Sequence, residues 1–242
     1  MPGKDPKDVK SYRPISLSPI IAKLLEKLIL RRIDPDFTTS DWIPRHQFGF
    51  RQAHSTIQRC HRITHTILKV INNKEYLTSV FLDVSQAFDR VWHPGLLYKV
   101  KNRLSTFFPL LKSYLSNRQF RTRIKGEVST LFPINSGVRQ GSVLGPKLYL
   151  LFTSDRPQAP NVMIGTFADD PVILTYHTDV LRVSSCLQEY LNILQIWLHA
   201  WKIKINESKS TYPTFTLQRV PSPSIYLNNV EIPPATTVKY LG

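Results

Sequence analysis

Short apolar runs alternate with polar turns along this 242-residue chain, and several have the length of a β-strand. The runs 162–167 and 172–176 flank an acidic tip and predict a β-hairpin. A third run, 77–82, predicts a strand that ends at Asp83. The alternating segment 120–124 predicts a further strand.

Other segments have apolar residues at helical spacing. They are 19–33 with Ser18 as N-cap, 56–71, 94–104, 107–116, 146–153 and 179–201. The apolar face predicted for the first helix comprises Ile21, Leu24, Leu25, Leu28 and Ile29. The inward face predicted for the second comprises Ile57, Cys60, Ile63, Ile67 and Val70. Helices mixed with antiparallel hairpins predict an α+β fold.

The composition indicates a folded protein with an acidic partner. Hydrophobic residues make up 42% of the chain, which is enough for one large or two small cores. The formal net charge is +15, from 32 basic and 17 acidic residues. Such an excess disfavours compactness unless a polyanion neutralises it. Nucleic acid is the first candidate and an acidic membrane surface the second; basic residues spread along the chain favour a lined groove.

The cysteines and the N-terminus bear on the compartment. Cys60 and Cys186 allow one disulfide at most, which favours a reducing environment. The polar N-terminus is not a signal peptide, and no apolar stretch approaches the roughly 18 residues that span a bilayer. The sequence therefore predicts an intracellular protein, nuclear or cytoplasmic, without a membrane partner.

Three carboxylates form the main candidate for chemistry. Asp169 and Asp170 are adjacent at the hairpin tip, and Asp83 ends another strand. Neighbouring carboxylates repel each other unless a cation lies between them. Two strands that deliver acids to one place could hold a pair of Mg²⁺ ions for phosphoryl transfer. The alternative for the acidic pair alone is a solvated turn.

Seven motifs in order resemble the reverse transcriptase of non-LTR retrotransposons, especially the jockey-like elements of arthropods. The resemblance covers nearly the whole chain. Each motif alone is weak, but seven in the family's order make chance implausible. They are SYRPISL (11–17), HQFGFR with HST (46–51 and 54–56), FLDVSQAFDRVW (81–92), QGSVLGP (140–146), FADD (167–170), KINESKS (204–210) and YLG (240–242).

The resemblance implies a right-hand polymerase fold in a single reverse transcriptase domain over 1–242. The fingers would comprise about 1–75 and 100–133. The palm, with an antiparallel sheet, would comprise about 76–99 and 134–242. We expect no thumb after this segment and no endonuclease region before it, and hence a piece of a longer element that binds nucleic acid but extends primers poorly or not at all by itself.

The resemblance also implies the partners and the catalytic acids. We expect an RNA template, a DNA primer and dNTPs as partners. Asp83, Asp169 and Asp170 would hold two Mg²⁺ ions, with Mn²⁺ as a substitute. Lys209 matches a palm lysine that could protonate the departing pyrophosphate.

Four further residues match nucleotide-binding positions of the family. Phe88 would lie under the incoming sugar and exclude a 2′-hydroxyl. Gln140 and Gly141 would approach the nucleotide closely. Arg13 would contact the triphosphate. The alternative for Phe88 is an ordinary core phenylalanine, and for Arg13 and Lys209 it is an ordinary surface charge.

The chain departs from the family's pattern at Arg139 and Pro171, where a proline and a small residue are usual. The intact acids favour an RNA-directed DNA polymerase, which transfers a nucleotide from a dNTP to a primer 3′-hydroxyl. The departures and the missing regions favour the alternative, a catalytically inactive nucleic-acid-binding remnant. An RNA-directed RNA polymerase is a weaker rival, because Phe88 and the lead-in to the acids argue against it.

Overall fold

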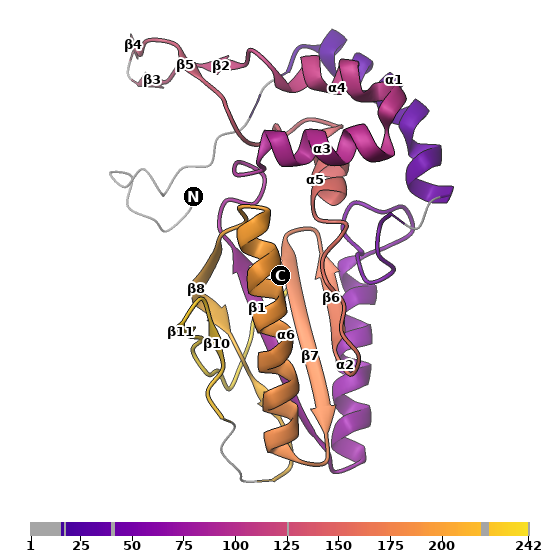
Figure 1. The fold of residues 1–242 in the computed structure, drawn as a ribbon, viewed down its shortest axis with the longest axis vertical. Helices are drawn as coiled ribbons and strands as arrows, with labels where there is room; N and C mark the ends of the chain where they lie inside the picture. The colour runs from indigo at the N-terminus through magenta and orange to yellow at the C-terminus, as the bar shows by residue number, and fades with distance from the viewer. Residues whose placement is uncertain (1–15, 17, 40–41, 125, 219–222, 242) are drawn as a thin grey trace.

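A five-stranded sheet with one helix on each face lies beneath a group of four further helices (Figure 1). The computed structural model describes residues 16, 18–39, 42–124, 126–218 and 223–241. The helices are α1 (Ile20–Thr39), α2 (Thr56–Asn72), α3 (His93–Arg103), the 3₁₀ turn η2 (Ser105–Phe107), α4 (Phe108–Leu115), α5 (Gly145–Phe152) and α6 (Val180–Ala200). The strands are β1 (Tyr76–Val84), β2 (Gln119–Phe120), β3 (Arg123–Ile124), β4 (Glu127–Val128), β5 (Phe132–Pro133), β6 (Met163–Phe167), β7 (Asp170–His177), β8 (Ile205–Thr211), β9 (Thr214–Phe215), β10 (Tyr226–Leu227) and β11 (Val230–Glu231).

The main sheet has the order β6-β7-β1-β8, and β9 pairs with β1 beyond the end of β8. Its strand pairs are antiparallel. The predicted hairpin is the β6–β7 pair, and the predicted strand that ends near Asp83 is β1. The predicted α+β class is therefore confirmed.

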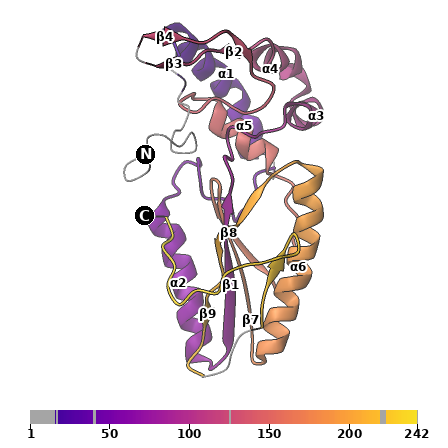
Figure 2. The same ribbon diagram turned by 90° about the vertical axis from the view of Figure 1, so that its left-hand side faces the viewer.

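Helices α2 and α6 cover opposite faces of this sheet (Figure 2). Successive residues of a strand point to opposite faces. Accordingly, Phe81 and Val172 join the core under α2, whereas Leu82 and Ile173 join the core under α6. Because side chains alternate between the two faces, the positions of Phe81 and Val172 indicate on which face of the sheet the neighbouring acids lie.

Helix α1 packs with a face that is rotated from the predicted apolar face and shares only Ile29 with it. Its buried positions are Glu26, Ile29, Ile33 and Phe37, which recur every three or four residues. The predicted face is mostly exposed: Ile21 is 81% exposed, and Leu24, Leu25 and Leu28 are 51–56% exposed. Glu26 fixes this orientation, because its carboxylate accepts bonds from Val143 N–H (2.7 Å) and Tyr114 O–H (2.9 Å).

One position of the face predicted for α2 was also wrong. Ile63 and Val70 are buried and Cys60 and Ile67 partly buried, but Ile57 is 79% exposed. Arg59 takes the inward place in this turn. Ile57 lies about 200° around the helix from Arg59, because each residue advances about 100°.

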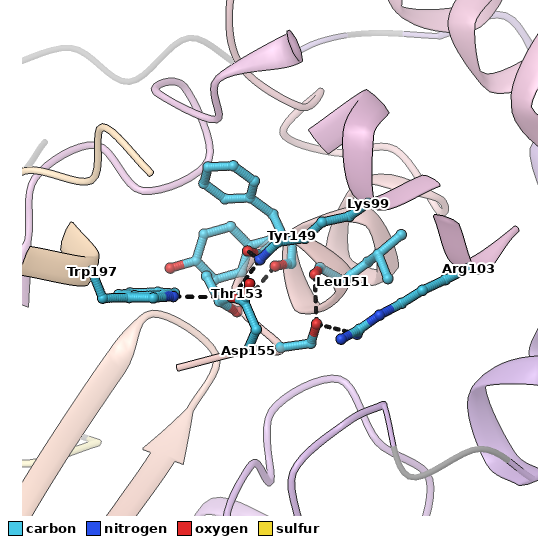
Figure 3. A network of polar contacts seen from close by, with 9 residues as sticks. Lys99, Arg103, Tyr149, Leu151, Thr153, Asp155 and Trp197 are labelled. Atoms are coloured by element: carbon cyan, nitrogen blue, oxygen red, sulfur yellow. Dashed lines mark hydrogen bonds and ion pairs between the residues drawn. The ribbon is translucent and has the colours of Figure 1, made fainter. Parts of the chain in front are cut away.

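A buried lysine joins α3 to α5 and α6 (Figure 3). Lys99 on α3 pairs with Asp155, Nζ to Oδ1 at 2.5 Å, and also donates to the carbonyl of Phe152. Trp197 of α6 donates to the same carboxylate oxygen at 3.0 Å. Burial lowers the pKa of Lys99 to about 8, and Asp155 offsets only part of that effect.

Two further observations concern the cysteines and the length of the apolar helices. Cys60 and Cys186 are free thiols in this structure. Within the described part of the chain, no helix is long and apolar enough to cross a membrane.

Candidate active site

The acidic tip is a tight two-residue turn. Phe167 ends β6 and pairs with Asp170, the first residue of β7, so that Ala168 and Asp169 form the turn. Ala168 adopts φ +58, a left-handed conformation that non-glycine residues rarely take. The first central position of a II′ hairpin turn requires such a positive φ. An alanine in this conformation depends on its surroundings to hold it there.

The side chain of Gln47 holds the turn. Its amide donates to the carbonyl of Ala168 (3.2 Å), and its oxygen accepts from the N–H of Ala168 (3.0 Å) and from that of Gly49 (2.8 Å). A Cβ at Gly49 would lie 2.1 Å from the backbone nitrogen of Ala168. The HQFGFR motif therefore supports the acidic turn, and its glycine is required by close packing.

Backbone bonds join the same motif to the free edge of β6. Thr166 N–H donates to the carbonyl of His46 at 3.0 Å, and Phe48 N–H donates to the carbonyl of Thr166 at 2.9 Å. These bonds make a short parallel bridge between Gln47 and Thr166. Burial, with lesser effects from nearby arginines, lowers the pKa of His46 to about 4, so its ring is neutral at physiological pH.

Asp83 lies at the same end of the sheet as the acidic turn. The β1–β7 register runs to Phe81↔Val172, and two more steps along each strand reach Asp83 and Asp170. Both acids alternate in phase with Phe81 and Val172, which face α2. Asp83 N–H donates to the hydroxyl of Ser210 at 3.1 Å. Asp83 and the acidic pair thus come from adjacent strands at one end of the sheet.

Pro171 stands where the β1–β7 ladder stops. Pairing with β6 continues through Thr166↔Pro171, but pairing with β1 ends at Phe81↔Val172. The next β1 partner would be Leu82, and proline has no N–H with which to donate to it. Pro171, which departs from the family's pattern, therefore coincides with the end of the pairing between β1 and β7, next to Asp170.

The three acids have the chemistry of a magnesium site without forming a closed cage. Among the described residues, no group of three or more His, Cys, Asp or Glu side chains is close enough together to hold a metal ion. Polymerase-type sites bind Mg²⁺ through one or two carboxylates together with substrate phosphates and waters. Carboxylates at one sheet end are compatible with that pattern, in which phosphates and waters supply the remaining oxygens.

Phe88 belongs to an aromatic stack next to the acids. Its ring stacks on Tyr149 of α5, with centroids 4.8 Å apart, and meets Phe50 edge-on at 5.8 Å. Burial raises the pKa of Tyr149, and the charge of Asp169 raises it further. Phe88 is partly exposed, so it packs against the core while part of the residue stays accessible.

The loop before α5 contains the other predicted nucleotide contacts. Gln140 donates its amide to both carboxylate oxygens of Asp89, each at 2.8 Å. Gly141 is exposed and has φ +91, which requires glycine. The unusual Arg139 lies over the ring of Tyr114 at 5.2 Å, so the fold accommodates it.

Two predicted residues remain without a described contact to the acids. Lys209 is exposed on β8. Asp83 pairs with Asn206 and Phe81 with Thr211, so β8 has a bulge between these two pairs, and Lys209 lies within it. Arg13 lies outside the described residues.

Sequence reasoning missed three residues that support this end of the sheet. Gln47 and Tyr240 belong to motifs of the family, but the sequence predicts no role for either. Nothing in the sequence pattern distinguishes Tyr149 from the other residues of its predicted helix. Tyr240 donates its hydroxyl to the carbonyl of Asp170 (3.2 Å) and packs on Phe81. The motifs single out Gln47 and Tyr240, but only the structure identifies the backbone group to which each side chain is hydrogen-bonded.

Comparison with protein families gives a match over almost the whole chain. Residues 4–242 match the family described as "Reverse transcriptase (RNA-dependent DNA polymerase)". The chain is 43% identical, over 99% of its length, to the RNA-directed DNA polymerase from mobile element jockey of Drosophila melanogaster. It is 44% identical to the probable RNA-directed DNA polymerase from transposon X-element of the same fly. The chain spans 27% of the length of each of these relatives.

Solved structures agree at the level of the fold. The apo telomerase of Candida tropicalis, truncated from its C-terminal domain, superposes with a TM-score of 0.58. At 15% identity the match covers 87% of this chain and 43% of that one. Motif order, family match and fold agree, and the chain belongs to the reverse transcriptase family.

Proposed function

We propose that this domain is the RNA-directed DNA polymerase of a non-LTR retrotransposon. It would transfer a nucleotide from a dNTP to the 3′-hydroxyl of a DNA primer paired with an RNA template. The observation that supports the proposal most strongly is the turn at Ala168–Asp169, held in a rare backbone conformation next to Asp83. Strain that the surroundings maintain at an acidic turn is typical of a functional site.

In the proposed mechanism, Asp83 and Asp169 would be the principal ligands of two Mg²⁺ ions, and Asp170 would assist. When bound, the ions lower the pKa of the primer hydroxyl and neutralise charge on the leaving pyrophosphate. The chain's own contribution is placement. Gln47 and Gly49 fix the backbone that carries Asp169, and the hydroxyl of Ser210 fixes the backbone of Asp83. Positioning of this kind provides most of the catalysis in phosphoryl transfer.

The remaining predicted residues receive roles at the nucleotide. The accessible part of Phe88 would meet the sugar, with Tyr149 as a rigid backing. Gln140 and Gly141 would approach the sugar from the loop before α5, and the Asp89 contact orients the Gln140 amide. Lys209 would donate a proton to the departing pyrophosphate, and Arg13 would contact the triphosphate. In this proposal, the fingers are 1–75 and 100–133, and the palm is 76–99 and 134–242.

Primer extension on an RNA template tests the proposal. The chain is incubated with a DNA primer, an RNA template, dNTPs and Mg²⁺, and incorporation is compared with that of Asp169→Asn. We expect weak template-directed incorporation that the variant loses. Incorporation equal in both proteins would contradict the assignment.

Pro171 favours the alternative, a nucleic-acid-binding remnant without catalysis. The lost β1–β7 pair lies directly beside Asp170, and a small change in acid placement can abolish phosphoryl transfer. The same assay separates the two functions. A remnant disabled by Pro171 would bind primer–template as tightly as an active enzyme and would incorporate nothing, and Pro171→Thr should restore incorporation.

A further inference from the structure

A basic groove lies between α2 and the edge strand β6, outside the set of residues assigned to catalysis. Its volume is about 510 Å³, in the range of small-ligand sites. The charged and titratable side chains that line it are three arginines and three histidines, and no acidic residue is among its described lining. They are Arg45, Arg59, Arg62, His46, His61 and His65.

One of these arginines is buried with an unused donor. Arg59 is 6% exposed, and its Nε is buried without a hydrogen-bond partner. Its guanidinium occupies the space that a Cβ on Gly165 would fill, and its Cζ lies 5.4 Å from the centroid of the Phe48 ring. Arg62 lies over the same ring at 4.9 Å. Two guanidinium groups that share one ring repel each other, and a bound anion would relieve that repulsion.

The groove also has planar and apolar surfaces. The exposed rings of His61 and His65, one helical turn apart, are nearly parallel, with centroids 6.4 Å apart and an angle of 11°. The apolar part of the lining includes Ile164 and Leu174. Cationic walls, planar rings and an apolar floor together suit a nucleotide, since phosphate pairs with arginine and an unpaired base stacks on a ring.

We infer that this groove holds an unpaired segment of the RNA template. The inference rests on the proposed polymerase function, in which the template is single-stranded ahead of the primer end. The location supports this occupant. His46 lines the groove, and its carbonyl bonds Thr166, three residues before Asp169. A strand in the groove would therefore run directly beside the turn that carries the acids.

Binding without dNTPs, followed by fluorescence anisotropy, tests the inference. Two DNA primer–RNA template hybrids are compared, one with a 5′ RNA overhang and one blunt. The variants are Arg62→Gln and the double change His61→Ala with His65→Ala. Arg182→Gln on α6 is the matched control, because it removes one exposed charge on the opposite face of the sheet.

We expect each groove variant to weaken binding of the overhang hybrid by about tenfold. The blunt hybrid and the Arg182→Gln control should change little. For Arg62→Gln, the slope of log affinity against log salt should decrease in magnitude by about 0.7, the value for one single-strand phosphate. Thermal unfolding checks that the variants remain folded.

Equal losses on both hybrids, or no loss on either, would overturn the inference, as would an equal loss in the Arg182→Gln control. The same experiment with a DNA overhang separates the sources: an equal loss there would overturn the assignment to the RNA template. If the chain cannot extend primers but its binding still depends on the overhang and on the groove residues, the proposed catalysis is contradicted and the template-binding groove is supported.

Discussion

At the scale of single residues, the acidic turn depends on one amide side chain. Gln47 satisfies the N–H and the C=O of Ala168 and a third backbone group at Gly49. These bonds lie in a buried region, where an unsatisfied polar group costs about 1–3 kcal/mol. The conformation of the turn, and with it the placement of Asp169, follows from a residue more than a hundred positions away.

Replacement of Gln47 by methionine keeps the side-chain volume and removes these bonds. We expect the free energy of unfolding to decrease by about 3 kcal/mol. We also expect kcat for primer extension to decrease more than tenfold with little change in KM, since placement of the acids is lost rather than binding. Denaturant unfolding and steady-state extension measure both effects. Gln52→Met, an exposed change in the same segment, is the control, and an equal effect there would contradict the assigned role.

Phe88 should select deoxyribonucleotides if its accessible part meets the sugar. Phe88→Ala would leave room for a 2′-hydroxyl, so the ratio of kcat/KM for dNTP over rNTP should decrease at least tenfold. Phe50→Ala removes the ring that meets Phe88 edge-on and serves as the control. If the dNTP/rNTP ratio of kcat/KM is unchanged in Phe88→Ala, the ring serves only to pack against Tyr149 and does not select the sugar.

At the scale of secondary-structure elements, the hairpin β6–β7 and strand β1 diverge at Pro171. Pro171→Thr supplies the missing N–H, and we expect the ladder to extend by a pair with Leu82. The new bond contributes about 1 kcal/mol, and loss of the proline's rigidity offsets most of it, so stability should hardly change. Hydrogen exchange is the direct readout: the amide of residue 171 in the variant should be as protected as that of Ile173. Rapid exchange at residue 171 would show that the proline is not what ends the ladder.

Helices α3, α5 and α6 meet at Lys99, whose pKa is lowered to about 8 in the folded protein. Unfolded lysine titrates near 10.5, so the unfolded state binds more protons between pH 8 and 10 and stability should rise with pH there, by at most about 3 kcal/mol. Tyrosines with pKa values raised to about 12, such as Tyr114, oppose this only above pH 10. Denaturant unfolding at pH 8 and 9.5 measures the slope. Lys99→Met should flatten it, and an equally steep slope in the variant would contradict the buried-lysine account.

The elements themselves were largely predictable from the sequence, but the direction in which α1 faces was not. Periodicity located β1, the hairpin, α6 and the start of α1 within a few residues, although α1 continues six residues beyond its predicted end. For α1 the larger apolar face is exposed, and the buried face combines a few apolar residues with Glu26, which accepts hydrogen bonds from Val143 and Tyr114. A polar contact between distant segments leaves no periodic signal, and the same limitation hid the role of Gln47 and the groove around Arg59.

At the scale of the whole molecule, the chain brings distant segments to one end of its sheet. Asp83 comes from β1 and Asp169 from the β6–β7 turn. The loop 46–51 stabilises that turn through the hydrogen bonds of Gln47. Motif order predicts that the acids converge, and the structure places Asp83 and the acidic turn on adjacent strands at the same end of the sheet. The overall charge of +15 fits the proposed nucleic-acid partner, and the groove beside β6 concentrates part of it next to the acids.

The central claim is that Asp83 and Asp169 act as one unit. Single-turnover incorporation on an RNA template tests this most directly, with Asp83→Asn, Asp169→Asn and the double variant. Residues that serve one step together are strongly non-additive, so each single change should lower the rate by about a thousandfold or more, and the double variant should be no slower than the worse single variant. Losses that multiply in the double variant would show that the two acids act independently and would contradict the account.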